Sequence, residues 1–212
     1  MIISKHEQGS YEWLQEKIGV VGGTRVSSII TPAKMQLSKS SSDLILKLID
    51  ESITGLSAES GFKSDGMDRG NELEPLAREQ YEAVGGSKIN EHGLCLSESN
   101  PMHGLSPDGF TDDFKGAIEI KCPGFKHLKY ISADYPKVTI YDDYKTQCIN
   151  YFLVNDKLEW LDTVSFRPEF YPNPLHIVRI NRADIYEDIE KVRIAVDEFF
   201  ENFNIEYNKY TF

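Results

Sequence analysis

Apolar and charged residues alternate near the middle of the chain. The run Ile-Glu-Ile-Lys at residues 118–121 predicts a β-strand, because successive side chains of a strand point to opposite faces. Its two isoleucines would point into a core, and Glu119 and Lys121 would project together from the other face. Similar alternation predicts three further strands, at residues 88–97, 158–166 and 175–181.

Apolar residues recur at helical spacing in much of the remaining chain. Ser10 is a candidate N-cap for the first of these segments, and Gly19 and Gly55 would end the first and second helices. The acidic segment near the C-terminus carries a long apolar stripe that would serve as a core or partner face. The predicted helices cover residues 7–18, 42–54, 67–83, 125–133, 141–154 and 183–206. The mixture of helices and strands indicates an α/β protein.

Length and composition narrow the class of protein. A chain of 212 residues suits one domain that can bury a core without disulfides, and 40% hydrophobic with 27% charged residues is typical of a soluble α/β protein. No apolar run approaches a membrane span and no signal peptide is visible, so we expect a cytoplasmic protein without a membrane partner. Three scattered cysteines argue against a disulfide framework, a zinc knuckle or an iron–sulfur cluster.

The most informative chemistry surrounds the predicted strand at residues 118–121. Asp108, in Ser-Pro-Asp-Gly, lies eleven positions before Glu119, and the turn formers between them predict a hairpin that brings the two carboxylates together. Close carboxylates repel each other unless a cation lies between them, and Mg²⁺ prefers one or two carboxylates plus water and phosphate oxygens. Lys121 would sit beside the phosphate or the attacking water. The pattern therefore predicts a metal-dependent nuclease site, with a surface hairpin that carries these residues by chance as the alternative.

The net charge of −11 is unusual for a protein that binds DNA. Its distribution is uneven, because residues 115–137 hold five lysines against two acids, whereas residues 184–206 hold eight acids against one lysine and one arginine. Basic residues thus gather beside the motif. An acidic exterior around a locally basic channel fits an enzyme that works from DNA ends.

A Gly-Gly turn after the first predicted helix leads into another helix start. Backbone amides there, with Thr24 and the cations Lys17 and Arg25 nearby, would make an anion site, although a plain loop with a solvated arginine explains the segment equally well. Residues 32–42 form either a loop near the substrate or a surface excursion. His103 is more typical of a packing residue than of a ligand.

Several of these motifs together resemble the phage-type exonucleases of the YqaJ viral recombinase family, the lambda-exonuclease type. The resemblance covers most of the chain. It departs at Lys145, where the family usually has a glutamine, and at Lys17, where it usually has an arginine. The matching segments are residues 7–9 with Trp13, 17–19, 69–74, 106–109, 118–123 and Gln147.

The resemblance implies a restriction-endonuclease-like α/β core, in which a mixed central sheet is flanked by helices. By matching position, Asp108, Glu119 and the carbonyl of Ile120 would bind Mg²⁺. Asp108 would bridge to a second Mg²⁺, and Mn²⁺ is expected to substitute. Glu74 would support the metal site. Lys121 would orient or deprotonate the attacking water, and Gln147 would lie beside the reacting phosphate.

The family also implies an activity and partners. Its members resect linear double-stranded DNA from the 5′ end, often as trimeric rings, and work with a single-strand annealing protein during phage or prophage recombination. Lys17, Thr24, Arg25 and Ser106 correspond to its pocket for a terminal 5′-phosphate or adjoin it. Because lysine offers a point charge in place of a bidentate fork, we expect Arg25 to compensate.

The expected organisation is a single nuclease domain over residues 1–212. Residues 1–66 would carry the phosphate pocket, residues 67–182 the catalytic core and residues 183–206 the acidic helix. Two alternatives remain: an endonuclease on the same core, and a catalytically silent module that binds DNA ends or a partner.

Overall fold

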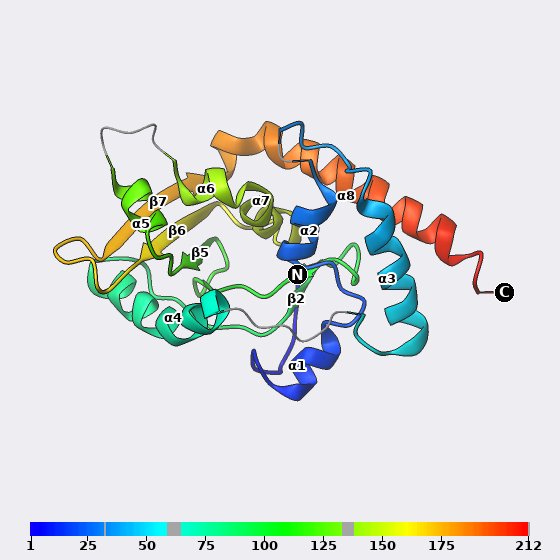
Figure 1. Cartoon of the computed structure of the whole chain (residues 1–212), viewed down its shortest axis with the longest axis horizontal. Coiled ribbons are helices and arrows are strands. Elements are labelled where there is room, and N and C mark those ends of the chain that lie inside the picture. The colour runs from blue at the N-terminus through cyan, green and yellow to red at the C-terminus, as the bar shows by residue number, and fades with distance from the viewer. Residues whose placement is uncertain (32, 59–64, 133–137, 212) are drawn as a thin grey trace.

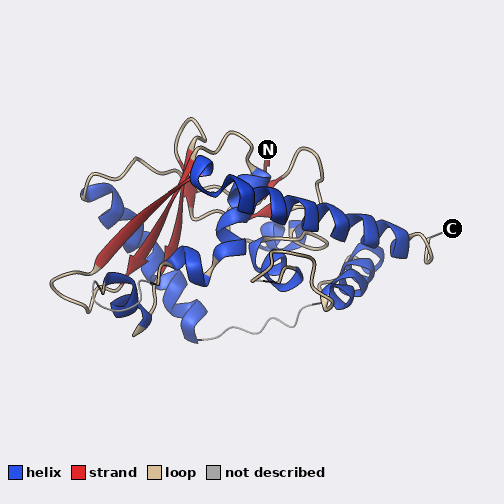
Figure 2. Ribbon diagram, turned by 90° about the horizontal axis from the view of Figure 1, so that it is seen from above, coloured by secondary structure: helices blue, strands red, loops and turns tan. Residues whose placement is uncertain are grey.

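A four-stranded mixed sheet lies toward one end of the molecule, and a mainly helical part lies toward the other (Figures 1 and 2). The computed structural model describes residues 1–211 except Pro32, residues 59–64 and residues 133–137. The strand order is β4-β5-β6-β7, with β4 antiparallel to β5, β5 parallel to β6 and β6 antiparallel to β7. The strands are β4 (Gly109–Phe110), β5 (Gly116–Lys121), β6 (Trp160–Phe166) and β7 (Leu175–Asn181). The strands predicted at 118–121, 158–166 and 175–181 are confirmed.

Helices cover both faces of β5. On one face, Ile118 and Ile120 pack with Ala77 and Tyr81 of α4 (Asp65–Ala83). On the other face, Ala117 joins a larger cluster that includes residues of α7 (Lys145–Val154) and α8 (Tyr186–Tyr207). The predicted inward direction of the isoleucines is therefore confirmed. The opposite face is covered as well, so Glu119 is buried and Lys121 is only partly exposed.

The N-terminal part contributes three helices and, with two later strands, a small antiparallel sheet, and the second and third helices pack into the same large cluster. The sheet has the order β1 (Ile2–Ile3), β2 (Cys95–Leu96), β3 (Gly104–Leu105). The helices are α1 (Tyr11–Glu16), α2 (Gly23–Ile29) and α3 (Ser41–Thr54). Ser10 caps α1 by accepting a hydrogen bond from the Trp13 amide, as predicted. Gly55 ends α3 with a left-handed backbone (φ 68°) that favours glycine.

Three predicted elements differ in the structure. The strand expected at 88–97 shrinks to β2 and a single bridge from Asn90 to Phe110, because this segment passes from one sheet to the other. The helix expected at 141–154 is two helices, α6 (Ile140–Asp143) and α7, separated by the non-helical backbone of Tyr144. The helix expected at 183–206 begins as a 3₁₀ turn at Arg182–Ile185, which precedes α8. Helix α5 (Lys126–Ile131) lies within the predicted 125–133, and Ala133 is outside the described residues.

The apolar stripe of α8 belongs to the core. Its members are Ile189, Val192, Ala195, Val196, Phe199, Phe200 and Phe203, all buried within this chain. The stripe is therefore the core face of α8, and the alternative role as a partner face stays a prediction. Among the described residues, no helix is long and apolar enough to cross a membrane.

Candidate active site

The β4–β5 hairpin brings the predicted catalytic side chains together. Asp108 directly precedes β4, and the pairing of Gly109 with Ile118 sets it beside β5. The Ile120 amide donates a hydrogen bond to Asp108 Oδ2 (2.5 Å). On the same strand, Lys121 Nζ forms an ion pair with Glu119 Oε1. The hairpin predicted from the turn residues between Asp108 and Glu119 is confirmed.

Burial makes this group of charges unusual. Glu119 is only 1% exposed. Burial, and next the neighbouring Glu119, raise the pKa of Asp108 well above its ordinary range, and Lys121 only partly opposes them. Burial alone would lower the pKa of Lys121, but Glu119 and Asp108 outweigh it and raise that pKa. The site therefore holds more acidic groups than its one ammonium can balance.

A third acid and a buried arginine approach from α4. Glu74 Oε1 accepts a hydrogen bond from Arg78 Nη2 (2.8 Å), and Arg78 Nε donates to the carbonyl oxygen of Asp108 (3.2 Å). Burial raises the pKa of Glu74 although Arg78 opposes the shift, and Glu119 adds to it. Pro75 lies inside α4, so Glu74 belongs to the interior of this helix. Arg78 fixes both Glu74 and the backbone of Asp108.

Helix α7 supplies the opposite wall. The Tyr151 hydroxyl accepts a hydrogen bond from the Asp108 amide (3.2 Å). Burial and the nearby carboxylates of Glu119 and Asp108 raise the pKa of Tyr151 well above its ordinary value, so it stays a neutral phenol. At the start of α7, the Tyr144 ring centroid lies 4.9 Å from Lys121 Nζ. Tyr144, Gln147 and Tyr151 lie at positions i, i+3 and i+7, a helical spacing that indicates one shared face.

Gln147 connects this wall with the N-terminal segment. A Cβ atom added to Gly23 would lie 3.0 Å from Gln147 Cγ, so the glutamine side chain packs against the first residue of α2. Thr24, the predicted phosphate ligand, is the next residue and is exposed. Glycine at position 23 therefore permits the close approach of α2 and α7 beside the site.

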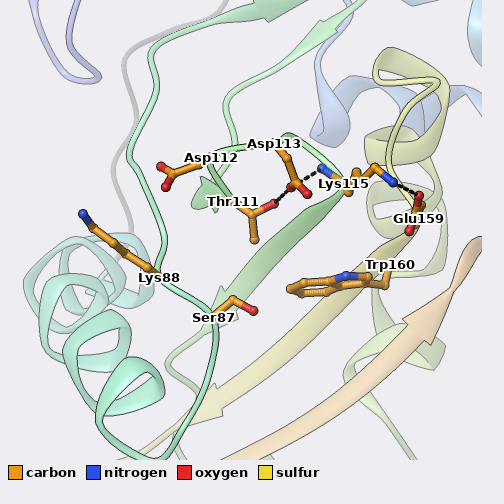
Figure 3. Close-up of a pocket in the computed structure, with 8 residues that line it drawn as sticks. All are labelled: Ser87, Lys88, Thr111, Asp112, Asp113, Lys115, Glu159 and Trp160. Atoms are coloured by element: carbon orange, nitrogen blue, oxygen red, sulfur yellow. Dashed lines mark hydrogen bonds and ion pairs between the residues drawn. The ribbon is translucent and has the colours of Figure 1, made fainter.

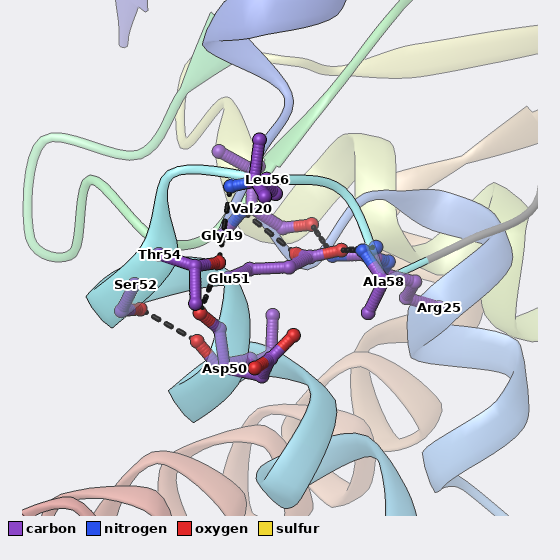
Figure 4. A network of polar contacts seen from close by, with 10 residues as sticks. Gly19, Val20, Arg25, Asp50, Glu51, Ser52, Thr54, Leu56 and Ala58 are labelled. Carbon is purple, nitrogen blue, oxygen red and sulfur yellow. Dashed lines mark hydrogen bonds and ion pairs between the residues drawn. The ribbon is translucent and has the colours of Figure 1, made fainter.

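The remaining residues predicted for the 5′-phosphate pocket have varied surroundings. Lys17 Nζ lies 4.0 Å from the ring centroid of Trp13. Ser106 Oγ is buried and has no hydrogen-bond partner among the described residues. Arg25 forms a bidentate ion pair with Glu51 of α3, at 2.7 and 2.8 Å (Figure 4). Arg25 thus joins α2 to α3, and its contact with a terminal phosphate stays a prediction.

The donor set of the site suits a hard divalent cation. The predicted ligands, the carboxylates of Asp108 and Glu119 and the carbonyl of Ile120, all offer oxygen donors, and crowded carboxylates with a raised pKa, as at Asp108, are stabilised by a cation between them. Within the described residues, no three His, Cys, Asp or Glu side chains gather closely enough to hold a metal by themselves. Mg²⁺ meets this situation because it keeps several water ligands.

A separate pocket opens at the other end of β5 (Figure 3). Its volume is about 430 Å³, and Trp160 lies against Gly116, where a Cβ atom would be 2.1 Å from the indole ring. None of the predicted catalytic or phosphate-binding residues lines it. Its lining residues are Ser87, Lys88, Thr111, Asp112, Asp113, Lys115, Glu159 and Trp160.

Solved structures resemble this chain over nearly its whole length. The crystal structure of an alkaline exonuclease (LHK-Exo) from Laribacter hongkongensis matches with a TM-score of 0.71 and 28% identity, over 94% of this chain and 97% of that one. Its complex with dAMP matches with a TM-score of 0.70 at the same identity and coverage. A phage related exonuclease from Haemophilus somnus 129PT matches in fold, with a TM-score of 0.59, 16% identity and coverage of 88% and 96%.

These neighbours carry a restriction-endonuclease-like α/β fold, so the predicted fold class is confirmed. No curated protein gives a significant match to the sequence. The sequence signature of the YqaJ-like viral recombinase domain matches residues 12–157, which include every element of the candidate site. The chain belongs to the YqaJ-like viral recombinase family.

Proposed function

We propose that this protein is a Mg²⁺-dependent exonuclease that degrades linear double-stranded DNA from 5′ to 3′. It would release mononucleotides and leave a 3′ single-stranded overhang for phage-type recombination. The observation that carries the proposal is the convergence of Asp108, Glu119 and Lys121 on one hairpin, in a chain whose family contains phage-type exonucleases. The related enzyme from Laribacter hongkongensis was solved with dAMP, a mononucleotide, which supports the proposed product.

The carboxylates of Asp108 and Glu119 and the carbonyl oxygen of Ile120 would hold the cation, with Asp108 shared by a second ion and Glu74 beside them. Bound Mg²⁺ lowers the pKa of coordinated water and stabilises charge on the attacking and leaving oxygens. Mn²⁺ would substitute. Arg78 keeps Glu74 and the Asp108 backbone in place, so the ligands are positioned before the cation arrives.

Lys121 is placed to act on water or phosphate next to these ligands. Its ammonium is held beside the ligand carboxylate of Glu119, and from there it would orient or deprotonate the attacking water. Gln147, which packs against Gly23 of α2, would contact the reacting phosphate with its amide. Tyr151 holds the Asp108 amide and thereby fixes the hairpin.

The 5′-to-3′ polarity would be set by a pocket for the terminal 5′-phosphate, formed mainly by the N-terminal segment. Lys17, Thr24 and Ser106 would receive the terminal 5′-phosphate, and the buried hydroxyl of Ser106 is a donor still available for such a ligand. Lys17→Ala should reduce the preference for a 5′-phosphate over a 5′-hydroxyl by about 10- to 150-fold, because a hydrogen bond to a charged group contributes about 1.5–3 kcal/mol. An unchanged preference would remove Lys17 from the pocket.

The proposed setting follows the family. The protein would work in the cytoplasm of a bacterial host as a phage or prophage product, as a homo-oligomeric ring, and with a single-strand annealing protein. Sedimentation of the purified protein with and without linear duplex would measure its oligomeric state.

The direct test is digestion of a linear duplex that carries a 5′ label on one strand and a 3′ label on the other. With Mg²⁺, the 5′ label should be released first as a mononucleotide while the 3′ label remains in long fragments. Early release of the 3′ label would contradict the polarity. Cleavage of covalently closed circular duplex would favour an endonuclease. A protein inactive with both Mg²⁺ and Mn²⁺ would favour a silent binding module.

A further inference from the structure

Exposed aromatic and basic side chains gather directly after the catalytic strand. Phe125, which precedes α5, is 68% exposed, and Tyr171, in the loop between β6 and β7, is 89% exposed. Two lysines of α5 and one arginine of the loop accompany them. We call this the α5–loop surface, and its members are Phe125, Lys126, Lys129, Arg167 and Tyr171.

The α5–loop surface begins at the active site. The ammonium groups of Lys121 and Lys126 lie 4.9 Å and 5.9 Å from the centroid of the same Tyr144 ring. One turn further along α5, Lys129 Nζ lies 6.0 Å from the Phe125 ring. Cations and aromatic rings therefore follow one another from the catalytic lysine outward along α5.

The loop is held firmly against α5. Arg167 Nη1 donates to the carbonyl oxygen of Gly124 (3.2 Å), and His127 Nε2 lies 2.9 Å from the carbonyl oxygen of Asn173. Phe170 packs on the buried His127, with ring centroids 5.6 Å apart. Because Phe170 faces inward, its neighbour Tyr171 points into solvent from a braced loop. The exposure of Tyr171 is therefore maintained by the contacts that hold the loop against α5.

Local charge favours a negatively charged occupant. Two acids at the edge of the surface are already paired, Asp143 with Lys126 (3.2 Å) and Glu169 with Arg69 (2.9 Å). Arg167 Nε also lies 3.9 Å from Glu169, so this acid is shared by two arginines, and Lys129 adds further positive charge. In a chain with a net charge of −11, a basic and aromatic surface beside the catalytic strand is a strong local departure.

We propose that the α5–loop surface binds single-stranded DNA next to the active site. The proposal rests on the proposed nuclease function and adds to it the path of an unpaired strand. Exposed aromatic rings give stacking platforms to bases of any sequence, and basic side chains follow the phosphates, which is the usual design for single strands. A base would stack on Phe125 or Tyr171, while Lys129 and Arg167 contact the backbone.

The test measures binding of a fluorescent oligothymidylate to the full-length protein by anisotropy, in EDTA so that no cleavage occurs. Phe125→Ala and Tyr171→Ala should each weaken binding by about 5- to 150-fold, since stacking contributes about that much per base. Lys129→Gln should reduce the salt dependence by about one counterion. The matched control is Tyr186→Ala, which removes a tyrosine 59% exposed on α8 and should leave the affinity unchanged.

Unchanged affinity in the double variant Phe125→Ala/Tyr171→Ala, with a normal thermal unfolding curve, would overturn the inference. A change of oligomeric state in light scattering, with unchanged affinity, would also overturn it and assign the surface to a second copy of the chain. Digestion of linear duplex is measured separately on the same samples. Active protein with unaltered single-strand binding would refute this inference and leave the nuclease function standing, whereas inactive wild-type protein would count against the function itself.

Discussion

Two carboxylates inside this protein have opposite surroundings. The side chain of Glu51 is fully buried, yet it accepts hydrogen bonds from the Gly19 amide (2.8 Å), the Ala58 amide (3.1 Å) and both terminal nitrogens of Arg25 (Figure 4). Burial would raise the pKa of Glu51, but the hydrogen bonds from Arg25, Gly19 and Ala58 lower it overall. Asp108 receives the Ile120 amide but lies near Glu119 and Glu74, and its pKa is raised.

The difference separates an acid that serves the fold from one that serves a ligand. Glu51 has its own counterion and donors, so the pair with Arg25 ties α2 to α3 without outside help. The acids around Asp108 exceed the cations that the chain supplies, and such crowding is retained where function requires it. We therefore expect removal of the charge to lower the stability of the fold at Glu51 and to leave it unchanged or raise it at Asp108.

The largest effect is expected at the amine of the catalytic hairpin. Lys121→Ala should lower the rate of cleavage by about 10²–10⁴-fold, because the group that orients the attacking water is lost. Mg²⁺ binding and DNA binding should persist, since the ligand carboxylates remain. Single-turnover cleavage of linear duplex measures the effect. Lys115→Ala, at the other end of β5, is the matched control, and normal turnover in Lys121→Ala would overturn the assignment.

At the structural acid, the expected loss is one of stability. Glu51→Gln should lower the free energy of unfolding by about 3–5 kcal/mol, because Arg25 is left largely buried without its counterion. Urea unfolding measures this, with the exposed neighbour substitution Asp50→Asn as control. A change below about 0.5 kcal/mol, the usual range for surface sites, would show that the Glu51 network does not support the fold.

Addition of Mg²⁺ should affect only the crowded site. At a concentration of 100 times its dissociation constant, Mg²⁺ should stabilise the wild type by about 2.7 kcal/mol. Asp108→Asn should abolish this gain and also cleavage, and without metal it should be at least as stable as the wild type because one repelling charge is gone. Glu51→Gln should keep the gain. Equal stabilisation of wild type and Asp108→Asn would contradict the assignment of Asp108 as a ligand.

Smaller effects should appear in the pH dependence of stability without metal. The folded pKa of Glu51 is lowered, so its contribution is present above its ordinary value of 4.5 and is lost as the pH falls below it. The folded pKa of Asp108 is raised, so its contribution is present below its ordinary value of 3.8 and is lost as the pH rises through the folded pKa. We would measure the free energy of unfolding of Glu51→Gln, Asp108→Asn and the wild type from pH 3 to 8. The difference from the wild type should change with pH in opposite directions for the two variants. Parallel curves would remove the distinction.

The sequence predicted the catalytic hairpin better than it predicted the network around Glu51. Asp108, Glu119 and Lys121 lie within fourteen residues, and both strand alternation and turn chemistry act over such short distances. Arg25 and Glu51 lie on two helices that meet only through tertiary packing, so no periodic signal joined them. The sequence therefore did not indicate the Arg25–Glu51 pair, and the expected contact of Arg25 with a phosphate stays a prediction.

The sequence predicted the walls of the site less well than the catalytic hairpin but better than the network around Glu51. Arg78 lies four residues after Glu74 and Tyr151 four after Gln147, so both shared a helix face with a predicted site residue. Their roles depend on the position of Asp108 across the fold, which local spacing does not give. The break at Tyr144 was also hidden, because the apolar periodicity continues through it.

Calorimetric titration of Mg²⁺ into the metal-free wild type and into Asp108→Asn tests the central claim most directly. We predict a saturable binding heat in the wild type that is absent in Asp108→Asn, while both variants unfold cooperatively. Equal binding in the two proteins would contradict the claim that the crowded carboxylates of the β4–β5 hairpin form the metal site of a nuclease.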